Sequence, residues 1–525
     1  MKLVTVAEMQ QVEKQADAAG LTYAQMMENA GQNLGLYVWK TYGAGGVNGA
    51  LGLVGSGNNG GDTLVCLAYL ASQGWSTCAY IARPRPENDP LVGRLLSLGG
   101  TIIDSEQDKP TDRYPLLKRV ISEYPILLDG VLGTGARLPL KPEIAAILDI
   151  PRKYISEIKS PPVVVAVDCP SGVDCDTGQH APEAIPAQIT VTMAAVKRGL
   201  LAFPAFPLVG NIQVVEIGPL NNLNLPAWNA IMNHVAEQEL ITRILPKRAL
   251  DSHKGTFGVA VIIAGSENYT GAVLLAGEAA YRIGAGWVTL AVPEFLHPIL
   301  AGHLLEATWV LLPHKEGVIA REAALVIKNN LERCTALLIG PGFGLRAATQ
   351  QFLEDFIDNI DKFPPMVVDA DGLKLLARIP NWYTRLPALT ILTPHPGEMC
   401  ELTGLSLEEI KADRLNVAVR FARLWGKIVV LKGAFTIIAS PEGETYTIPV
   451  ATPALARAGT GDVLAGIIVG LLAQGVNSFH AAVAGAWIHA QAGISASKMV
   501  GSTASVIAGD VLSSIKSVIA DIVHK

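Results

Sequence analysis

The residues Ala458-Gly459-Thr460-Gly461-Asp462 combine a flexible loop with a carboxylate, at the point where a long apolar helix is predicted to begin. Gly459 and Gly461 permit backbone conformations that other residues resist, so successive N–H groups can turn toward one point. A helix N-terminus also carries roughly half a positive charge, which attracts anions. A carboxylate beside such a site suits a base that takes a proton from a hydroxyl attacking a phosphate. The simpler interpretation is that Asp462 only caps the helix, because Asp is a favoured N-cap.

Three further glycine turns lie in the first half of the chain, each next to Asp or Asn and each after a predicted strand. They are residues 55–62 (Gly-Ser-Gly-Asn-Asn-Gly-Gly-Asp), residues 129–139 with Gly133-Thr134-Gly135, and residues 168–172 (Asp-Cys-Pro-Ser-Gly). The first matches the GxGxxG pattern of dinucleotide-binding loops. The acid that follows the next strand in that pattern is replaced by Arg83, which can reach a ribose phosphate, although a surface arginine is the simpler interpretation. Since ligands bind at the carboxyl ends of parallel strands, the three turns predict one site.

Short apolar runs separated by helix-like stretches predict a largely parallel α/β sheet in each half of the chain. The predicted strands of the first half are residues 50–54, 77–82, 126–128, 163–167, 189–193 and 212–217. Those of the second half are residues 259–264, 288–292, 336–339, 366–368, 390–392 and 428–431. Residues 5–40 predict two helices, the first with a capping box made by Thr5 and Glu8. We therefore expect one domain at 1–218, a linker region at 219–239 and a second domain at 240–525.

The composition excludes several classes of protein. Of 525 residues, 50% are hydrophobic and 17% charged, which is typical of compact domains and not of disordered chains. A net charge of −6 without basic runs argues against nucleic-acid binding. The six cysteines form no CxxC pair, the N-terminus lacks the apolar core of a signal peptide, and the apolar stretch 463–497 is interrupted by polar residues. We expect a cytoplasmic protein without membrane or nucleic-acid partners, and the apolar C-terminal helices suggest a homo-oligomer.

Taken together, the loops resemble those of the bifunctional NAD(P)H-hydrate repair enzymes. The three N-terminal turns are similar to the epimerase domain of that family, with Thr63 standing where the family commonly has Gly, a change we expect to be tolerated. The segments that resemble its ADP-dependent dehydratase domain are Lys254-Gly255-Thr256, Gly340-Pro341-Gly342, His395-Pro396-Gly397-Glu398, Lys432-Gly433-Ala434 and Gly459-Thr460-Gly461-Asp462. The resemblance implies a Rossmann-like three-layer sandwich for residues 1–218 and a ribokinase-like three-layer α/β/α fold for residues 240–525.

For the first domain, the resemblance implies a site for the hydrated nicotinamide nucleotide, with Asp168 as its catalytic residue. The implied substrate-binding residues are Asn58, Asn59, Gly60, Gly61, Asp62, Gly133, Thr134, Gly135, Ala136, Arg137, Leu138, Pro139 and Asp168. The resemblance also implies K⁺ at Asn59, Asp129 and Ser171, whose oxygens are hard ligands. Epimerisation needs reversible loss of hydroxide beside the ring nitrogen, which an acid of raised pKa assists. Lys197 is a candidate helper, although a solvated lysine is the simpler interpretation.

For the second domain, the resemblance implies that Asp462 deprotonates the hydroxyl of the hydrate, which attacks the terminal phosphate of ADP. The phosphate ester then leaves, and the products are NADH or NADPH, AMP and phosphate. The implied hydrate-binding residues are Ala272, Gly342, His395 and Asp462, and the implied nucleotide-binding residues are Lys432, Gly433, Ala434, Phe435, Thr436 and Gly461. Mg²⁺ is expected beside a transferring phosphoryl group. Neither a P-loop nor an HExxH motif occurs, so the sequence predicts no P-loop NTPase and no zinc site of that type.

Two alternatives stay open at the level of sequence. The second half can be a ribokinase-like kinase for a vitamin precursor, and the first half a non-catalytic nucleotide-binding or scaffold module. The Tyr269-Thr270-Gly271-Ala272 and His395-Pro396-Gly397-Glu398 loops favour the dehydratase, and the polar side chains of the N-terminal turns favour catalysis. ADP rather than ATP is implied by the resemblance alone, and His395 has a simpler interpretation as a turn residue.

Overall fold

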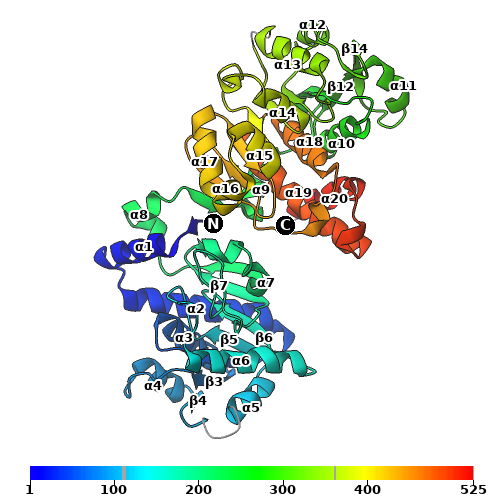
Figure 1. Ribbon diagram of the computed structural model, residues 1–525. Helices are drawn as coiled ribbons and strands as arrows, with labels where there is room; N and C mark the ends of the chain where they lie inside the picture. The colour runs from blue at the N-terminus through cyan, green and yellow to red at the C-terminus, as the bar shows by residue number, and fades with distance from the viewer. Residues whose placement is uncertain (109–113, 360–361, 524–525) are drawn as a thin grey trace. The chain divides into compact units, whose positions relative to one another are not determined.

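The computed structural model describes residues 1–108, 114–359 and 362–523, and it divides into two compact units, residues 1–232 and 233–525 (Figure 1). The first unit contains a seven-stranded sheet whose strands are all parallel, in the order β4-β3-β2-β5-β6-β7-β9. The strands are β2 (Gly49–Val54), β3 (Ser76–Ile81), β4 (Thr101–Asp104), β5 (Ile126–Gly130), β6 (Val163–Val167), β7 (Ile189–Met193) and β9 (Asn211–Val215). The six strands predicted for this half are confirmed, and β4 is the one that the sequence analysis missed.

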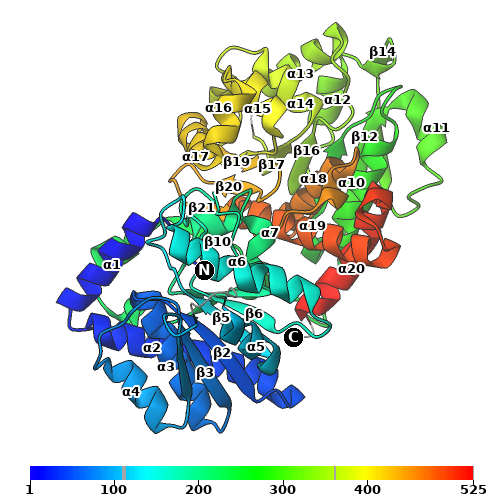
Figure 2. The same ribbon diagram turned by 60° about the horizontal axis from the view of Figure 1, so that its bottom comes forward.

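Helices cover both faces of this sheet, which confirms the predicted three layers (Figure 2). Successive residues of a strand point to opposite faces. Ala50 and Val54 therefore pack on the side of α1, α2 and α3, whereas Leu51 and Leu53 pack on the side of α5 and α6. The helices are α1 (Val6–Ala18), α2 (Tyr23–Tyr42), α3 (Asn58–Ser72), α4 (Pro90–Ser97), α5 (Pro115–Glu123), α6 (Pro142–Glu157), α7 (Phe206–Val209) and α8 (Pro226–Asn229).

A short parallel pair, β1 (Leu3–Val4) and β8 (Val196–Lys197), fixes the start of α1. The Thr5 hydroxyl accepts a hydrogen bond from the Glu8 N–H at 3.1 Å, and the Glu8 carboxylate accepts one from the Thr5 N–H at 2.7 Å. The predicted capping box is thus confirmed. Because Val4 stands opposite Lys197 in the pair, α1 begins next to that lysine.

The second unit is built on a ten-stranded sheet in the order β10-β21-β20-β19-β18-β17-β16-β11-β12-β13. All neighbouring strands are parallel except at β20, which runs antiparallel to both β19 and β21. The strands are β10 (Asn233–Val235), β11 (Val259–Ile263), β12 (Trp287–Pro293), β13 (Thr308–Leu312), β16 (Ala336–Ile339), β17 (Met366–Val368), β18 (Ile391–Leu392), β19 (Ile428–Leu431), β20 (Ile437–Ala439) and β21 (Thr445–Thr447), with a separate hairpin of β14 (His314–Lys315) and β15 (Val318–Ile319). The six predicted strands are confirmed.

Helices again form a layer on each face, as predicted. One face carries α9, α10, α18, α19 and α20, and the other carries α12 to α17. The helices are α9 (Gln238–Ile244), α10 (Gly271–Arg282), α11 (His297–Leu300), α12 (Ala323–Lys328), α13 (Ala347–Asn359), α14 (Asp371–Ala377), α15 (Pro396–Thr403), α16 (Leu407–Ala412), α17 (Arg414–Trp425), α18 (Thr460–Ala473), α19 (Ser478–Val500) and α20 (Ala508–Val523).

The range 219–239, where the sequence predicts a linker, is not a simple loop. Trp228 of α8 is buried in the core of the first unit, and β10 pairs with β21 in the second unit. The division between the units falls after Met232, inside this range.

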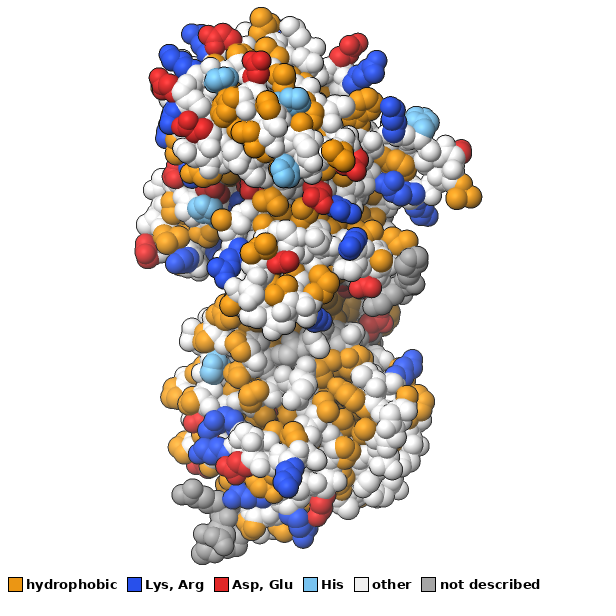
Figure 3. Space-filling model, turned by 90° about the vertical axis from the view of Figure 1, so that its right-hand side faces the viewer, with side chains coloured by type: hydrophobic (Ala, Val, Ile, Leu, Met, Phe, Trp, Pro, Cys, Tyr) orange, Lys and Arg blue, Asp and Glu red, His pale blue; other side chains and the backbone are white. Residues whose placement is uncertain are grey.

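The apolar stretch 463–497 forms α18 and α19, which lie in the core of the second unit. In the part of the chain that the structure describes, no helix has the length and apolar character needed to cross a membrane. On the face drawn in Figure 3, Lys and Arg side chains are interspersed with Asp and Glu.

Two glycines of α18 allow α10 to pack closely against it. A Cβ atom built on Gly466 would lie 2.3 Å from the Ala276 carbonyl oxygen, and one built on Gly470 would lie 2.3 Å from Cγ2 of Ile283. Real Cβ atoms do not approach other atoms so closely, so the absence of a side chain at these positions sets the spacing of the two helices. That spacing in turn positions the loop that precedes α18.

We predict that Gly466→Ala destabilises the second unit by about 1–3 kcal/mol, the usual cost of overpacking a core. Gly509→Ala is the matched control, because Gly509 lies in a helix with nothing within 4 Å of its Cβ position. There the substitution should leave stability unchanged or raise it by about 0.5–1 kcal/mol, since alanine is the better helix former. Urea denaturation of the two variants tests this, and equal midpoints would contradict the packing argument.

Candidate functional site

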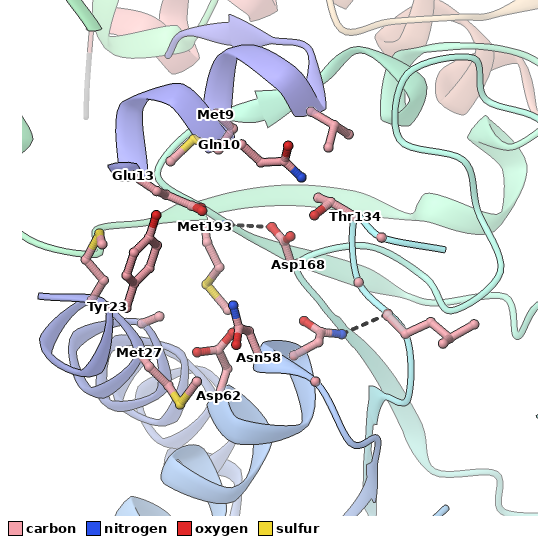
Figure 4. Close-up of a pocket in the computed structure, with 18 of the residues that line it drawn as sticks. Met9, Gln10, Glu13, Tyr23, Met27, Asn58, Asp62, Thr134, Asp168 and Met193 are labelled. Carbon is pink, nitrogen blue, oxygen red and sulfur yellow. Dashed lines mark hydrogen bonds between the residues drawn. The ribbon is translucent and has the colours of Figure 1, made fainter. Parts of the chain in front are cut away.

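A cavity of about 780 Å³ lies at the carboxyl ends of the central strands of the first unit (Figure 4). The three predicted turns meet there, since Asn58 follows β2, Gly133 follows β5 and Asp168 follows β6. Much of the remaining wall comes from α1 and α2, through Val6, Met9, Gln10, Glu13, Tyr23, Ala24, Met26, Met27 and Ala30. The sequence analysis had no site residue in these two helices.

The turn after β2 presents the uncapped start of α3 to this cavity. Gly57 is the N-cap residue, and no side chain accepts a hydrogen bond from the first N–H groups of the helix. The backbone folds tightly here, because a Cβ atom on Gly60 would lie 2.0 Å from the Gly55 carbonyl oxygen. Such a turn suits an anionic phosphate. Thr63 is accommodated, since its hydroxyl donates to the Asn59 carbonyl oxygen at 2.8 Å.

Asp168 and Lys197 form a buried ion pair at the cavity wall. The Lys197 ammonium donates to Asp168, to the Thr192 hydroxyl at 3.0 Å and to the Met193 carbonyl oxygen at 2.9 Å. The Asp168 carboxylate also accepts from the Met193 N–H at 3.0 Å, and its φ of 64° holds it in a turn that few non-glycine residues adopt. Lys197 is 1% exposed, so the interpretation of a solvated lysine is wrong.

Two further carboxyl groups line the same cavity without a hydrogen-bond partner among the described residues. Burial raises the pKa of Asp62 well above its usual value, and the negative charges of Asp168 and Glu13 raise it further. Burial also raises the pKa of Glu13, against the opposing charge of Lys197. Three carboxyl groups therefore share one ammonium, which favours the protonated form of the two that lack a partner.

The residues implied as K⁺ ligands lie together beneath the turns. Asp129 accepts hydrogen bonds from the Ser171 N–H at 2.8 Å and from the Ser171 hydroxyl at 2.5 Å. The Asn59 amide donates to the Leu132 carbonyl oxygen at 2.9 Å, while its own oxygen is buried without a partner. A buried amide oxygen without a donor fits a bound cation, so the residues present suit K⁺.

The cavity contains most of the residues that the resemblance implies as substrate-binding, but not all of them. Those that line it are Asn58, Asn59, Asp62, Gly133, Thr134, Gly135, Ala136 and Asp168. Gly60, Gly61, Arg137, Leu138 and Pro139 are not among its lining residues. Arg83 does line it, so a plain surface position is the wrong interpretation of that residue.

In the second unit, Asp462 does not cap α18. The N-cap residue is Gly459, and Asp462 occupies the third helical position without accepting a capping hydrogen bond. The capping interpretation is therefore wrong. Burial, together with the nearby charge of Asp369, raises the pKa of Asp462 to about 7, while Lys432 acts in the opposite direction. A carboxylate with that pKa is half-protonated near neutrality, which suits a general base.

Asp369, which the sequence analysis missed, is buried and forms an ion pair with the partly buried Lys432 next to Asp462. Its carboxylate accepts from the Lys432 ammonium at 2.8 Å and from the Thr393 hydroxyl at 2.6 Å. A second carboxylate, that of Glu398, lies 3.7 Å from the same ammonium. A Cβ atom on Gly461 would lie 3.6 Å from the Lys432 ammonium, so the pair abuts the start of α18.

The other predicted residues of this unit occupy neighbouring loops. His395 caps α15, its Nδ1 accepting from the Gly397 N–H at 3.0 Å, so its turn role is confirmed. Burial and the charges of Lys432 and Lys374 lower its pKa, against the opposing charge of Glu398. A Cβ atom on Gly342 would lie 3.2 Å from that of Ala272, so these two approach each other.

The loop of Lys432, Gly433, Ala434, Phe435 and Thr436 turns between β19 and β20. Arg414 of α17 holds it by donating to the Leu431 carbonyl oxygen at 3.1 Å, to that of Lys432 at 3.3 Å and to that of Ala434. Nothing in the sequence pattern indicated this role of Arg414, because an arginine in an amphipathic helix usually faces solvent.

Comparison with known proteins gives the same division of the chain. Residues 23–199 match a family model described as YjeF-related protein N-terminus, and residues 260–516 match one described as NAD(P)H-hydrate dehydratase. The bifunctional NAD(P)H-hydrate repair enzyme Nnr of Moorella thermoacetica is 34% identical over 525 residues, which cover 98% of this chain and 95% of that protein. The chain belongs to the family of bifunctional NAD(P)H-hydrate repair enzymes.

The enzyme of the same name from Escherichia coli is 33% identical over 488 residues, covering 91% of this chain and 86% of that protein. A crystal structure of the ADP/ATP-dependent NAD(P)H-hydrate dehydratase from Bacillus subtilis, co-crystallised with ATP and Mg²⁺, is 29% identical, covers 55% of this chain and 98% of that one, and has a TM-score of 0.46. Membership of the repair-enzyme family makes this chain an enzyme with an epimerase domain and a dehydratase domain.

For the epimerase domain, we predict that Asp168→Asn destabilises the first unit by about 3 kcal/mol, because it leaves the Lys197 ammonium buried beside a neutral group. The double variant with Lys197→Met should recover most of that loss. Urea denaturation read by peptide-resolved hydrogen exchange separates the two units. Equal stability of the single variant and the unchanged protein would contradict a buried ion pair at this position.

Proposed function

We propose that the two units repair hydrated NADH and NADPH in succession. The first interconverts the R and S hydrates, and the second dehydrates the S hydrate with ADP as co-substrate, giving NAD(P)H, AMP and phosphate. The proposal rests mainly on the position and pKa of Asp462. This residue lies in the first turn of α18, whose N-terminus has no side-chain cap, and its pKa is raised. A group in that position is suited to remove a proton beside a bound phosphate.

In the first unit, the cavity holds the hydrate between the turns and the two N-terminal helices. The start of α3 and Arg83 would bind phosphate groups, and Asp168, held in place by Lys197, would face the carbinol carbon. A carboxyl group at that position can exchange a proton with the hydroxyl group or with the water that replaces it. Asn59, Asp129 and Ser171 would hold K⁺, which supplies positive charge near the phosphates.

In the second unit, Ala272, Gly342 and His395 would position the hydrate, and residues 432–436 with Gly461 would bind the nucleotide. Asp462 removes the proton from the hydroxyl group of the hydrate. The oxygen of that hydroxyl group then attacks the terminal phosphate of ADP. The N–H groups at the start of α18 stabilise the charge that moves onto the phosphate oxygens. Mg²⁺ would be held mainly by the nucleotide phosphates. Mg²⁺ supplies charge neutralisation there.

A cytoplasmic location, a homo-oligomeric state and the lack of nucleic-acid partners stay predictions. All six cysteines are free thiols.

A mixture of both epimers of NADPH hydrate, incubated with ADP, Mg²⁺ and K⁺, tests the two assignments together. The unchanged protein should convert all the hydrate to NADPH. Asp168→Asn should stop when the S hydrate is consumed, apart from the uncatalysed rate, and Asp462→Asn should form no NADPH. Absorbance of the reduced nicotinamide follows the reaction, and Asp521→Asn, at an exposed site, is the control. NADPH formation by Asp462→Asn would refute Asp462 as the base of dehydration. Rapid full conversion by Asp168→Asn would refute Asp168 as the catalytic residue of epimerisation.

The pH profile of dehydration tests the role of Asp369. A base must be ionised, so the rate should fall as the pH drops below the pKa of Asp462, near 7. The negative charge of Asp369 raises that pKa, so Asp369→Asn should lower it and move the acidic limb down by about 1 pH unit. Single-turnover rates on the S hydrate from pH 5 to 9 measure the limb. Asp355→Asn, which removes an exposed partner of Arg321, should leave it in place. An upward shift in Asp369→Asn would contradict the argument.

A further inference from the structure

Glu13 is a carboxyl group of the epimerase cavity to which no role has been given so far. It projects from α1, whereas Asp168 projects from the end of β6 (Figure 4). Both carboxyl groups point into the same cavity from different elements. Asp62, the third carboxyl, lies further along the wall, beside Asn58 and Met27.

The helix that carries Glu13 is fixed at both ends. Its start is held by the pairing of β1 with β8, by the capping box and by a hydrogen bond of 2.8 Å from the Val6 N–H to Asp176. Near its end, Gln15 accepts from the Ala227 N–H at 2.9 Å. Met9, Val12 and Ala16 bury its inner face. Glu13 is therefore held at the cavity wall by the fold and is not a freely moving surface group.

Glu13 is half-buried and accepts no hydrogen bond from the residues that the structure describes. The Lys197 ammonium, the nearest buried cation in the cavity wall, already donates to Asp168, Thr192 and Met193, so it has no donor left for Glu13. Burial favours the neutral form of such a carboxyl group, and the charge of Asp168 adds to that preference. The cavity thus contains one carboxylate that is paired with lysine and, on a different element, an unpaired one whose neutral form is favoured.

Epimerisation needs two such groups. The hydroxyl leaves from one face of the nicotinamide ring, and water must return to the other face. One group must give a proton to the leaving oxygen while another takes a proton from the entering water, and a single carboxyl cannot reach both faces at once. Asp168 can supply only one of these functions.

We propose that Glu13 is a second catalytic residue of the epimerase, which donates a proton to the leaving hydroxyl on the face opposite Asp168. This inference rests on the proposed epimerase function. The C–O bond breaks as the oxygen takes the Glu13 proton and leaves as water, while the lone pair of the ring nitrogen forms a C=N⁺ bond. Water then adds to the other face, its proton passes to Asp168, and the electron pair of the C=N⁺ bond returns to nitrogen. The reverse epimerisation exchanges the two roles, and solvent returns the proton.

The groups that face Glu13 from neighbouring elements determine its titration. They are Asp168 after β6, Lys197 of β8 and Asp62 of α3, while Arg83 after β3 and Tyr23 of α2 line the same cavity. Asp62 is the competing candidate for the same role, because it too is unpaired and lines the cavity. Variants of Glu13 and Asp62 must therefore be compared.

The test measures epimerisation of pure R hydrate by the full-length protein without ADP, with the epimers separated by chromatography. Glu13→Gln should lower the rate by about 10²–10⁴-fold, the range for loss of a general acid, and Glu13→Asp should retain more activity. The alkaline limb of the rate profile, which reports loss of the Glu13 proton, should disappear in Glu13→Gln. Dehydration of pure S hydrate with ADP should stay unchanged in both variants, which shows that the second unit is folded, and peptide-resolved hydrogen exchange should show unchanged protection in the first unit. Lys14→Gln, on the exposed side of α1, is the matched control and should epimerise normally.

Two outcomes overturn the inference and can be told apart. In the first outcome the unchanged protein epimerises the R hydrate, and Glu13→Gln keeps a rate within about threefold of it together with the alkaline limb. If Asp62→Asn loses both the rate and the limb, then Asp62 is the acid and the proposed function stands. If the unchanged protein does not epimerise the R hydrate at all, the proposed function of the first unit fails and the role of Glu13 fails with it.

Discussion

A lysine paired with a buried aspartate that directly follows a strand determines the electrostatics of each site. In the first unit Lys197 holds Asp168, and in the second Lys432 holds Asp369. Taking both charges out of water is costly, and an apolar pair of the same volume is often as stable. What the ion pair supplies is a fixed negative charge and a fixed positive charge beside a further carboxyl group. That neighbour, Glu13 or Asp62 in one site and Asp462 in the other, then has a pKa shifted upward.

The backbone at each site packs unusually closely. A Cβ atom on Gly340 would lie 2.1 Å from the Asp369 carbonyl oxygen, so only glycine lets the end of β16 approach that aspartate. In the first unit the same role falls to Gly55, where a Cβ atom would lie 2.0 Å from the Val131 carbonyl oxygen. The glycines that give the sequence its recognisable loops therefore act partly through packing. They bring adjacent strand ends together and leave room for phosphate next to the buried charges.

How far the sequence predicts this arrangement depends on the signal that each residue leaves. Short apolar runs predicted the central strands, because burial on both faces requires them, whereas the edge strands β4 and β10 contain polar residues and are only partly buried, so they show no such run. Asp462 stood out because it follows two glycines. Asp369 and Glu13 did not stand out in the sequence. A single acidic residue after a strand or on an amphipathic helix gives the same sequence pattern as an acidic residue that faces solvent. Only the fold shows that both lie against a buried lysine or its partner.

The same contrast explains why the two sites suit different chemistry. Dehydration by phosphoryl transfer needs one base, and the second unit places one carboxyl of pKa about 7 beside a satisfied ion pair. Epimerisation needs an acid and a base on opposite faces of a ring. The first unit has carboxyl groups on separate elements, of which one is paired with lysine and the unpaired ones favour the neutral form. A single lysine shared among three carboxyl groups thus produces an acid and a base from the same chemical group at one pH.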